Sequence, residues 1–194
     1  MTRHLPMIKQ TEIKVLSDIG AIKHGDYVLK NGSKSDILVD LHGLASHPSI
    51  FRYLAEKVSS IVWDLGIDRV VGVPYAGIPL ATALSLMTDI PMLWVRKPAD
   101  SPHQPSGIEG DFTRASVACV VEDVVTTGAS VIETAQQLRD AGLIVRDVVT
   151  LADMEHGARD NLDADGLKLH ALVTLSEIRR YGLPHPVGPI TREE

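Results

Sequence analysis

Residues 116–130 read SVACVVEDVVTTGAS and predict the centre of the fold. The run Val117–Val121 is apolar and rich in β-branched residues, which is typical of a strand buried on both faces of a parallel sheet. Glu122 and Asp123 follow at once, where such a strand would leave the core. The spacing of apolar residues then becomes helical, so a helix is expected to begin near Gly128–Ser130 and to bury Val131, Ala135 and Leu138.

The loop between this strand and this helix has the composition of an anion site. Small residues let backbone N–H groups approach an anion, and a helix start adds unpaired N–H groups and a favourable dipole. The hydroxyl groups of Thr126, Thr127 and Ser130 can donate to phosphate oxygens. The adjacent carboxylates fit a ligand with a diol, because carboxylates accept hydrogen bonds from hydroxyl groups. The stretch therefore indicates a sugar phosphate, although exposed acids at an ordinary strand–helix turn would have the same spacing.

Other phosphate-binding patterns fit the chain less well. There is no G-x-x-x-x-G-K-[ST] sequence, although ACVVED resembles the acidic strand of a P-loop enzyme. No G-x-G-x-x-G follows a predicted strand either. An acidic pocket of the receiver type is compatible with the carboxylates, but it does not need the Thr-Thr-Gly-Ala-Ser loop.

The composition is that of an ordinary globular chain. Its 194 residues, 44% of them hydrophobic and 23% charged, are enough for a domain with a real core. The net charge of −6 argues against a general nucleic-acid surface, so an anion site must be local. The single cysteine, Cys119, lies in the predicted buried strand and cannot form an internal disulfide. No apolar run approaches the roughly 20 residues that span a bilayer, and the start is unlike a secretory signal, so a cytoplasmic protein without a membrane partner is expected.

Helices and strands are predicted to alternate along most of the chain. An amphipathic helix is expected over residues 7–19, and Asn31-Gly32 between short apolar runs is typical of a hairpin. Further helices are expected at 48–65, 78–87, 130–141 and 156–164. Strands are expected at 69–73, 90–95, 116–122, 143–151 and 167–175. The proline-rich stretch 98–111 shows no periodicity, which is typical of a functional loop.

This alternation predicts an α/β fold with a doubly wound, mainly parallel central sheet flanked by helices. In such sheets, ligands bind beyond the carboxyl ends of the strands. That rule brings several loops to one crevice, and this convergence strengthens the hypothesis of a site there. The loops are 74–77, 96–97, 122–130 and 153–157.

The sequence VVEDVVTTGAS at 120–130 resembles the PRPP-binding motif of type I phosphoribosyltransferases. PRPP, 5-phosphoribosyl 1-diphosphate, carries both the phosphate and the diol inferred above. Over nearly its whole length the chain further resembles the orotate phosphoribosyltransferase family. The matching segments are GDYVLKNGSKSDILVDL at 25–41, GVPYAGIPLATALS at 72–85, and VRK at 95–97 with a loop that ends in IEG at 108–110. The resemblance implies the type I phosphoribosyltransferase fold, with a small N-terminal hood at about 1–45, a core at 46–182 and a flexible tail at 183–194.

The resemblance also implies roles for individual residues. The acids hold the ribose hydroxyls and the loop through Ser130 cradles the 5-phosphate, while cations and a backbone turn meet the pyrophosphate. The implied PRPP-binding residues are Tyr75, Ala76, Arg96, Lys97, Glu122, Asp123, Val124, Val125, Thr126, Thr127, Gly128, Ala129 and Ser130. The implied catalytic residues are Asp123, Glu122 and Lys97, and those near the base are Lys30, Thr126 and Met154.

Two further features follow from the resemblance. No protein metal ligands are expected, and Mg²⁺ is expected to be held mainly through PRPP and pyrophosphate. The expected assembly is a homodimer, in which the loop of one subunit reaches the site of its partner.

The chain departs from the family pattern where the chemistry is expected. Counted back from 108–110, the second lysine of the family's loop falls on Asp100 and its aromatic position on Pro102. The family's Asp-Arg pair after the next strand becomes Asp153-Met154, and methionine cannot donate a hydrogen bond to the base. The arginine often found after Asp-Leu in the hood is His42.

The leading prediction is a transferase that moves the phosphoribosyl group of PRPP to orotate, giving orotidine 5'-monophosphate and pyrophosphate. The departures keep two alternatives open. One is a PRPP-dependent transferase for a different base, which Met154 favours. The other is a catalytically weak PRPP-binding regulatory protein, which the acidic loop around Asp100 favours, although the chain shows no DNA-binding extension.

Overall fold

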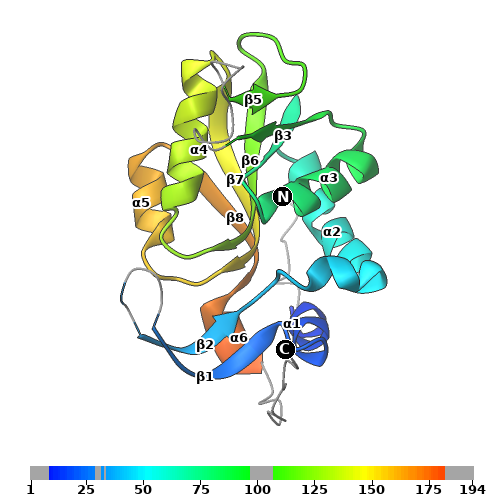
Figure 1. Ribbon diagram of the computed structural model, residues 1–194, viewed down its shortest axis with the longest axis vertical. Helices are drawn as coiled ribbons and strands as arrows, with labels where there is room; N and C mark the ends of the chain where they lie inside the picture. The colour runs from blue at the N-terminus through cyan, green and yellow to red at the C-terminus, as the bar shows by residue number, and fades with distance from the viewer. Residues whose placement is uncertain (1–8, 29–31, 33, 97–106, 182–194) are drawn as a thin grey trace, which may run out of the picture.

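The computed structural model describes residues 9–28, 32, 34–96 and 107–181 (Figure 1). Within these residues the main layer is a six-stranded sheet in the order β5-β4-β3-β6-β7-β8. Neighbouring strands are parallel, apart from β5, which runs antiparallel to β4. The predicted mainly parallel α/β sheet is therefore confirmed. Its strands are β3 (Arg69–Gly72), β4 (Met92–Val95), β5 (Ile108–Glu109), β6 (Val117–Val125), β7 (Ile144–Asp153) and β8 (Lys168–Thr174).

Helices cover both faces of this sheet (Figure 1). Helices α2 (Pro48–Trp63) and α3 (Gly77–Thr88) share one apolar cluster with Cys119 and Val121 of β6. Helices α4 (Ala129–Asp140) and α5 (Ala158–Ala164) share the other with Ala118 and Val120. Because successive side chains of a strand point to opposite faces, this continuous apolar run serves both clusters, as its composition predicts.

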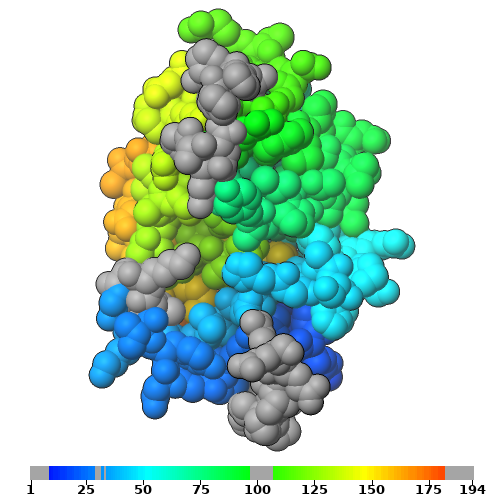
Figure 2. Space-filling model, viewed as in Figure 1, coloured from blue at the N-terminus to red at the C-terminus, as the bar shows by residue number. Residues whose placement is uncertain are grey.

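A smaller sheet forms the other end of the molecule, drawn in blue in the space-filling view (Figure 2). Strands β1 (Ile22–Val28) and β2 (Lys34–Val39) pair antiparallel, as expected for a hairpin, and we call this pair the hood. Helix α1 (Gln10–Asp18), the 3₁₀ turn η1 (Leu44–Ser46) and helix α6 (Leu175–Tyr181) adjoin it. Ile37 and Val39 of β2 belong to the same apolar cluster as α2 and α3, so the hood shares its core with the main sheet.

Some element boundaries differ from the sequence predictions. Strand β6 runs to Val125 and not to Glu122, because β7 continues to pair with it as far as Asp153. The expectation of no regular structure over 98–111 is wrong at Ile108–Glu109, which pair with β4. Helix α6 is not anticipated in the sequence. The predicted tail at 183–194 lies outside the described residues, and the division of the chain near residue 45 stays a prediction.

None of the described helices combines the length and the apolar character that crossing a membrane requires.

Candidate active site

The acidic pair lies inside the carboxyl-terminal part of β6, and Glu122 is only 7% exposed. The Oγ of Ser130 donates to Oε2 of Glu122 at 3.4 Å, and the amide of Asp123 donates to its Oε1 at 3.1 Å. The hydroxyl of Thr150 on β7 donates to the carbonyl oxygen of Asp123 at 2.9 Å. Both carboxylates are therefore carried by backbone that the neighbouring strand and helix hold in place.

Burial raises the pKa of the Glu122 carboxyl to about 8, and the negative charge of Asp123 acts in the same direction. Near neutral pH the protonated form of Glu122 is thus favoured while the site holds no ligand. A ligand with hydrogen-bond donors reverses this preference, because donors stabilise the carboxylate. The chemistry of the pair suits a diol, as its sequence position predicts.

The loop after β6 ends in a helix start with unpaired amides. Gly128 has a positive φ of 82° and precedes α4, whose first backbone hydrogen bond runs from Ile132 N to Gly128 O at 2.9 Å. The amides of residues 129–131 consequently have no acceptor within the helix. The side-chain amide of Asn161 donates to the carbonyl oxygen of Thr127 at 2.9 Å, which fixes the loop from the α5 side. This geometry favours an anion at the start of α4.

The loop before α3 lies beside Glu122 because two glycines allow a close backbone approach. A Cβ on Gly77 would lie 2.2 Å from the carbonyl oxygen of Val121 and 3.3 Å from Cα of Glu122, and one on Gly72 would lie 2.8 Å from Cα of Ile78. The Pro74–Tyr75 peptide bond in this loop is cis. Tyr75 in this loop is 63% exposed.

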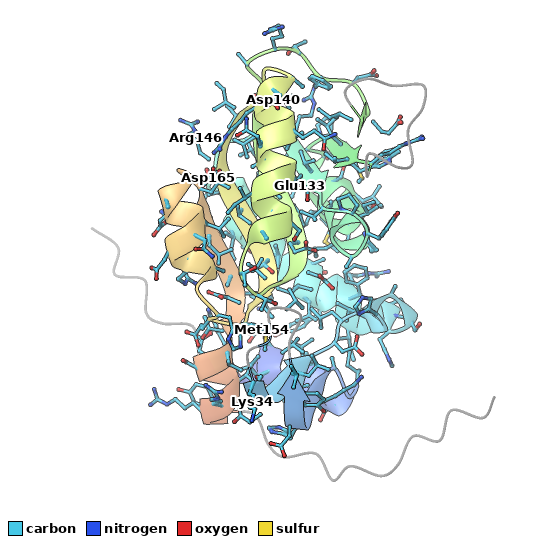
Figure 3. All side chains as sticks on the ribbon, turned by 60° about the vertical axis from the view of Figure 1, so that its left-hand side comes forward. Lys34, Glu133, Asp140, Arg146, Met154 and Asp165 are labelled. Carbon is cyan, nitrogen blue, oxygen red and sulfur yellow. The ribbon has the colours of Figure 1, made fainter. Side chains whose placement is uncertain are left out.

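A cavity of about 50 Å³ joins three of the predicted segments. Its lining comes from the ends of β3 and β4 and from the first turns of α4, and consists of Val73, Pro74, Val95, Arg96, Ser130, Glu133, Thr134 and Gln137. Glu133 and Gln137 are not among the predicted site residues, since their helical spacing from Ser130 signals only an exposed helix face. Figure 3 shows Glu133 on α4.

Arg96 is paired with an acid at the base of the loop that follows it. Its Nε lies 2.8 Å from Oε1 of Glu109, and its amide donates to the carbonyl oxygen of Gly107 at 2.7 Å. The two contacts link the end of β4 to the start of β5. Glu109 is a site neighbour that the sequence does not reveal, because the pairing of β4 with β5 brings it there.

The end of β7 faces the hood. Met154 is 2% exposed, belongs to the apolar cluster that includes the hood, and donates its amide to Val125 O at 2.8 Å. Buried Asp153 accepts the amide of Glu155 at Oδ1, and its Oδ2 lies 3.0 Å from Nε of Arg159. Figure 3 shows Met154 at the end of the sheet that faces the hood, above Lys34 of β2, with Asp140, Arg146 and Asp165 at the opposite end.

The predicted site residues fall into two groups. The predicted site residues that the structure describes lie around the carboxyl ends of β3, β4, β6 and β7. They are Tyr75, Ala76, Arg96, Glu122, Asp123, Val124, Val125, Thr126, Thr127, Gly128, Ala129, Ser130 and Met154. Lys30 and Lys97, like Asp100 and Pro102, lie outside the described residues. His42 is in the hood region, 83% exposed, with its Nδ1 2.9 Å from Oδ1 of Asp40. Within the described part of the chain, no three His, Cys, Asp or Glu side chains are grouped as a metal site.

Known proteins resemble this chain over most of its length. A uridine 5'-monophosphate synthase from Bos taurus is 42% identical over 165 residues, or 84% of this chain, which spans about a third (34%) of that protein. An orotate phosphoribosyltransferase from Pyrococcus abyssi is 36% identical over 173 residues, covering 88% of this chain and 95% of that one. A crystal structure of orotate phosphoribosyltransferase from Aeropyrum pernix matches with a TM-score of 0.77 and 31% identity over 89% of this chain and 99% of the other.

No protein-family model matches the chain. The sequence relatives and the shared fold, which is that of the type I phosphoribosyltransferases, nevertheless establish the family. The chain belongs to the orotate phosphoribosyltransferase family.

Proposed function

We propose that this protein transfers the phosphoribosyl group of PRPP to orotate, giving orotidine 5'-monophosphate and pyrophosphate. One observation carries the proposal. A buried acidic pair and the unpaired amides at the start of a helix stand at the end of the same strand, β6. The acids match the ribose diol and the amides match the 5-phosphate, so the two ends of one phosphoribosyl group are recognised together.

In the proposed reaction, a ring nitrogen of orotate loses its proton to solvent and bonds to the anomeric carbon, while the bond between that carbon and pyrophosphate breaks. Glu122 and Asp123 accept the ribose hydroxyls and orient the ring, and their negative charge stabilises an oxocarbenium-like transition state. The amides at 129–131 hold the 5-phosphate. The backbone of Tyr75 and Ala76 and the guanidinium of Arg96 face the pyrophosphate, and the family resemblance assigns Lys97 to the same task.

We propose Mg²⁺ as the cofactor, held mainly through PRPP and pyrophosphate. The oxygen-rich donor set at this edge, with the carboxylates of Glu122 and Asp123, is of the hard type that this ion prefers. When bound, Mg²⁺ neutralises charge on the leaving pyrophosphate.

On the base side we assign Thr126, Lys30 and Met154. Because Met154 is buried in the apolar cluster beneath the hood, it acts as an apolar wall and not as a hydrogen-bond donor. This burial is also what favours the second candidate, a transferase for a base with fewer acceptor groups than orotate.

We further propose a cytoplasmic homodimer, in which an N-terminal region near 1–45 contains the hood and the core spans 46–182. Helix α3, GIPLATALSLMT, carries no charged residue, and Leu86 on it is 79% exposed. Trp94 on the adjoining strand β4 is 37% exposed. An apolar surface of this kind is typical of an interface, and a second copy would cover it. Sedimentation of the wild type and of Leu86→Glu tests this, since the charged variant should sediment as a monomer.

The function is tested by following orotate absorbance with PRPP and Mg²⁺, beside a panel of other bases. Orotate is expected to be the preferred base, and Asp123→Asn is expected to lower kcat/KM by about 10²–10³. Asp140→Asn, at the opposite end of the sheet, is the matched control and should retain activity (Figure 3). Preference for another base would support the second candidate. PRPP binding without turnover of any base would contradict both.

A further inference from the structure

Helix α6 links the loop after β7 to the hood through two side chains. The carboxylate of Glu155, next to Met154, accepts the amide of Ser176 in the first turn of α6 at 2.6 Å. Near the other end of α6, Nη2 of Arg179 donates to Oδ1 of Asp36 on β2 at 2.5 Å. Figure 1 shows α6 beside β2, below the end of β8. The helix therefore contacts both walls of the proposed base site.

The start of α6 is itself firmly attached to the main sheet. Thr174, the last residue of β8, and Glu177 form a reciprocal cap: Glu177 N donates to Oγ1 of Thr174 at 3.2 Å, and Thr174 N donates to Oε2 of Glu177 at 2.9 Å. The ammonium group of Lys9 lies 3.3 Å from the same Oε2. This helix start is thus a continuation of the sheet, and Arg179 extends from it toward the hood.

Among its described residues, 22–28, 32 and 34–39, the hood has few directional contacts of this kind with the rest of the chain. Strands β1 and β2 form a sheet of their own, and their inner residues Ile37 and Val39 join the rest of the protein through the apolar cluster. Apolar burial is not directional, so it holds the hood without fixing its angle. A charged hydrogen bond does depend on geometry.

We propose that Arg179 is a positioning residue for base binding: through Asp36 it holds the hood at the carboxyl edge of β7, beside Met154. This inference rests on the proposed function, because the hood matters only if a base binds under it. The hydrogen bond from Arg179 lowers the pKa of Asp36, so the pair is charged at neutral pH. Both side chains are largely exposed, 50% and 65%, so the effect is modest and is screened by salt.

The test compares Arg179→Asp, Asp36→Arg and the double variant that exchanges the two charges. Each single variant should raise KM for orotate about two- to fivefold, with KM for PRPP and the melting temperature unchanged. The exchanged pair should restore the wild-type KM, and near 1 M salt the differences between the proteins should shrink, because charges more than roughly 3 Å apart are then screened. Lys14→Asp is the matched control, since its exposed pair with Asp18 (65% and 54%) lies on α1.

Other outcomes would overturn the inference. An unchanged KM for orotate in Arg179→Asp would do so, as would an equal rise in both KM values together with a lower melting temperature. Hydrogen exchange of the β2 amides gives a readout that needs no turnover. It should be faster in Arg179→Asp and recover in the exchanged pair; if it is unchanged, the inference fails even where the wild type proves active. A wild type that does not use orotate contradicts the proposed function alone, and the exchange result then decides the inference.

Discussion

Ser130, at the start of α4, donates its hydroxyl hydrogen bond to the buried carboxylate of Glu122 at the end of β6, with 3.4 Å between Oγ and Oε2. The contact joins the proposed phosphate-binding loop directly to the proposed ribose-binding acid. It also places an acid with a raised pKa next to an anion site, so protonation and ligand binding are expected to be linked.

The first prediction concerns stability and pH. The pKa of Glu122 is about 8 in the folded protein, against an ordinary value of 4.5, so the folded state binds the proton more tightly. The stabilisation from this group is complete below pH 4.5 and is lost as pH rises through 8. Melting temperatures measured without ligand over this range should fall more steeply for the wild type than for Glu122→Gln. If the melting temperatures of the two proteins fall in parallel with pH, the raised pKa of buried Glu122 is contradicted.

The second prediction concerns proton release. Ribose hydroxyls that donate to Glu122 favour its charged form, so PRPP with Mg²⁺ should expel a proton when it binds near pH 7. Calorimetry in two buffers of different ionisation enthalpy should then give two different binding enthalpies for the wild type. In Glu122→Gln the difference should shrink, which separates this proton from those of PRPP itself. Equal enthalpies in the wild type would show that Glu122 is already ionised.

The third prediction concerns the loop before α3. In Gly77→Ala the new Cβ meets the carbonyl oxygen of Val121 at 2.2 Å, so α3 and the loop at 74–76 must move away from Glu122. We expect a loss of about 1–3 kcal/mol in unfolding free energy and a raised KM for PRPP. Gly43→Ala is the control, because nothing lies within 4 Å of a Cβ there and its φ is −81°. Chemical denaturation and steady-state kinetics measure both effects.

The fourth prediction concerns Met154. Because this side chain is 2% exposed in an apolar cluster, Met154→Ala should cost about 2–5 kcal/mol in unfolding free energy. Met154→Leu keeps the volume and should cost less than about 1.5 kcal/mol. If Met154 is a wall of the base site, the leucine variant should also retain its KM for orotate. A large rise in that KM with unchanged stability would show instead that the thioether itself contacts the base.

Much of this molecule is readable from local sequence signals, and the remainder depends on distant partners. The run Val117–Val121 predicts a strand buried on both faces, because it contains no polar side chain that would face water. The strand's true end at Val125 depends on pairing with β7, which composition does not encode. Strand β5 has two residues and is defined by its pairing with β4, so it is too short for a periodic pattern to predict it.

The sequence does not predict helix α6, for a related reason. Its seven residues are too few to be stable alone, and its two ion pairs involve residues far away in the sequence, Lys9 and Asp36. The acidic pair at 122–123 is evident from the sequence, but the burial that sets the pKa of Glu122 emerges only when α4 and β7 pack around it.

Because Ile37 and Val39 of the hood share an apolar cluster with Leu172 and Ile178, the hood is not a removable cover. Deleting the hood would expose an apolar surface on the remaining chain, which would promote self-association. The two sheets should therefore unfold in a single cooperative transition. Any movement of the hood that admits a base is limited to a tilt that keeps the shared apolar cluster buried.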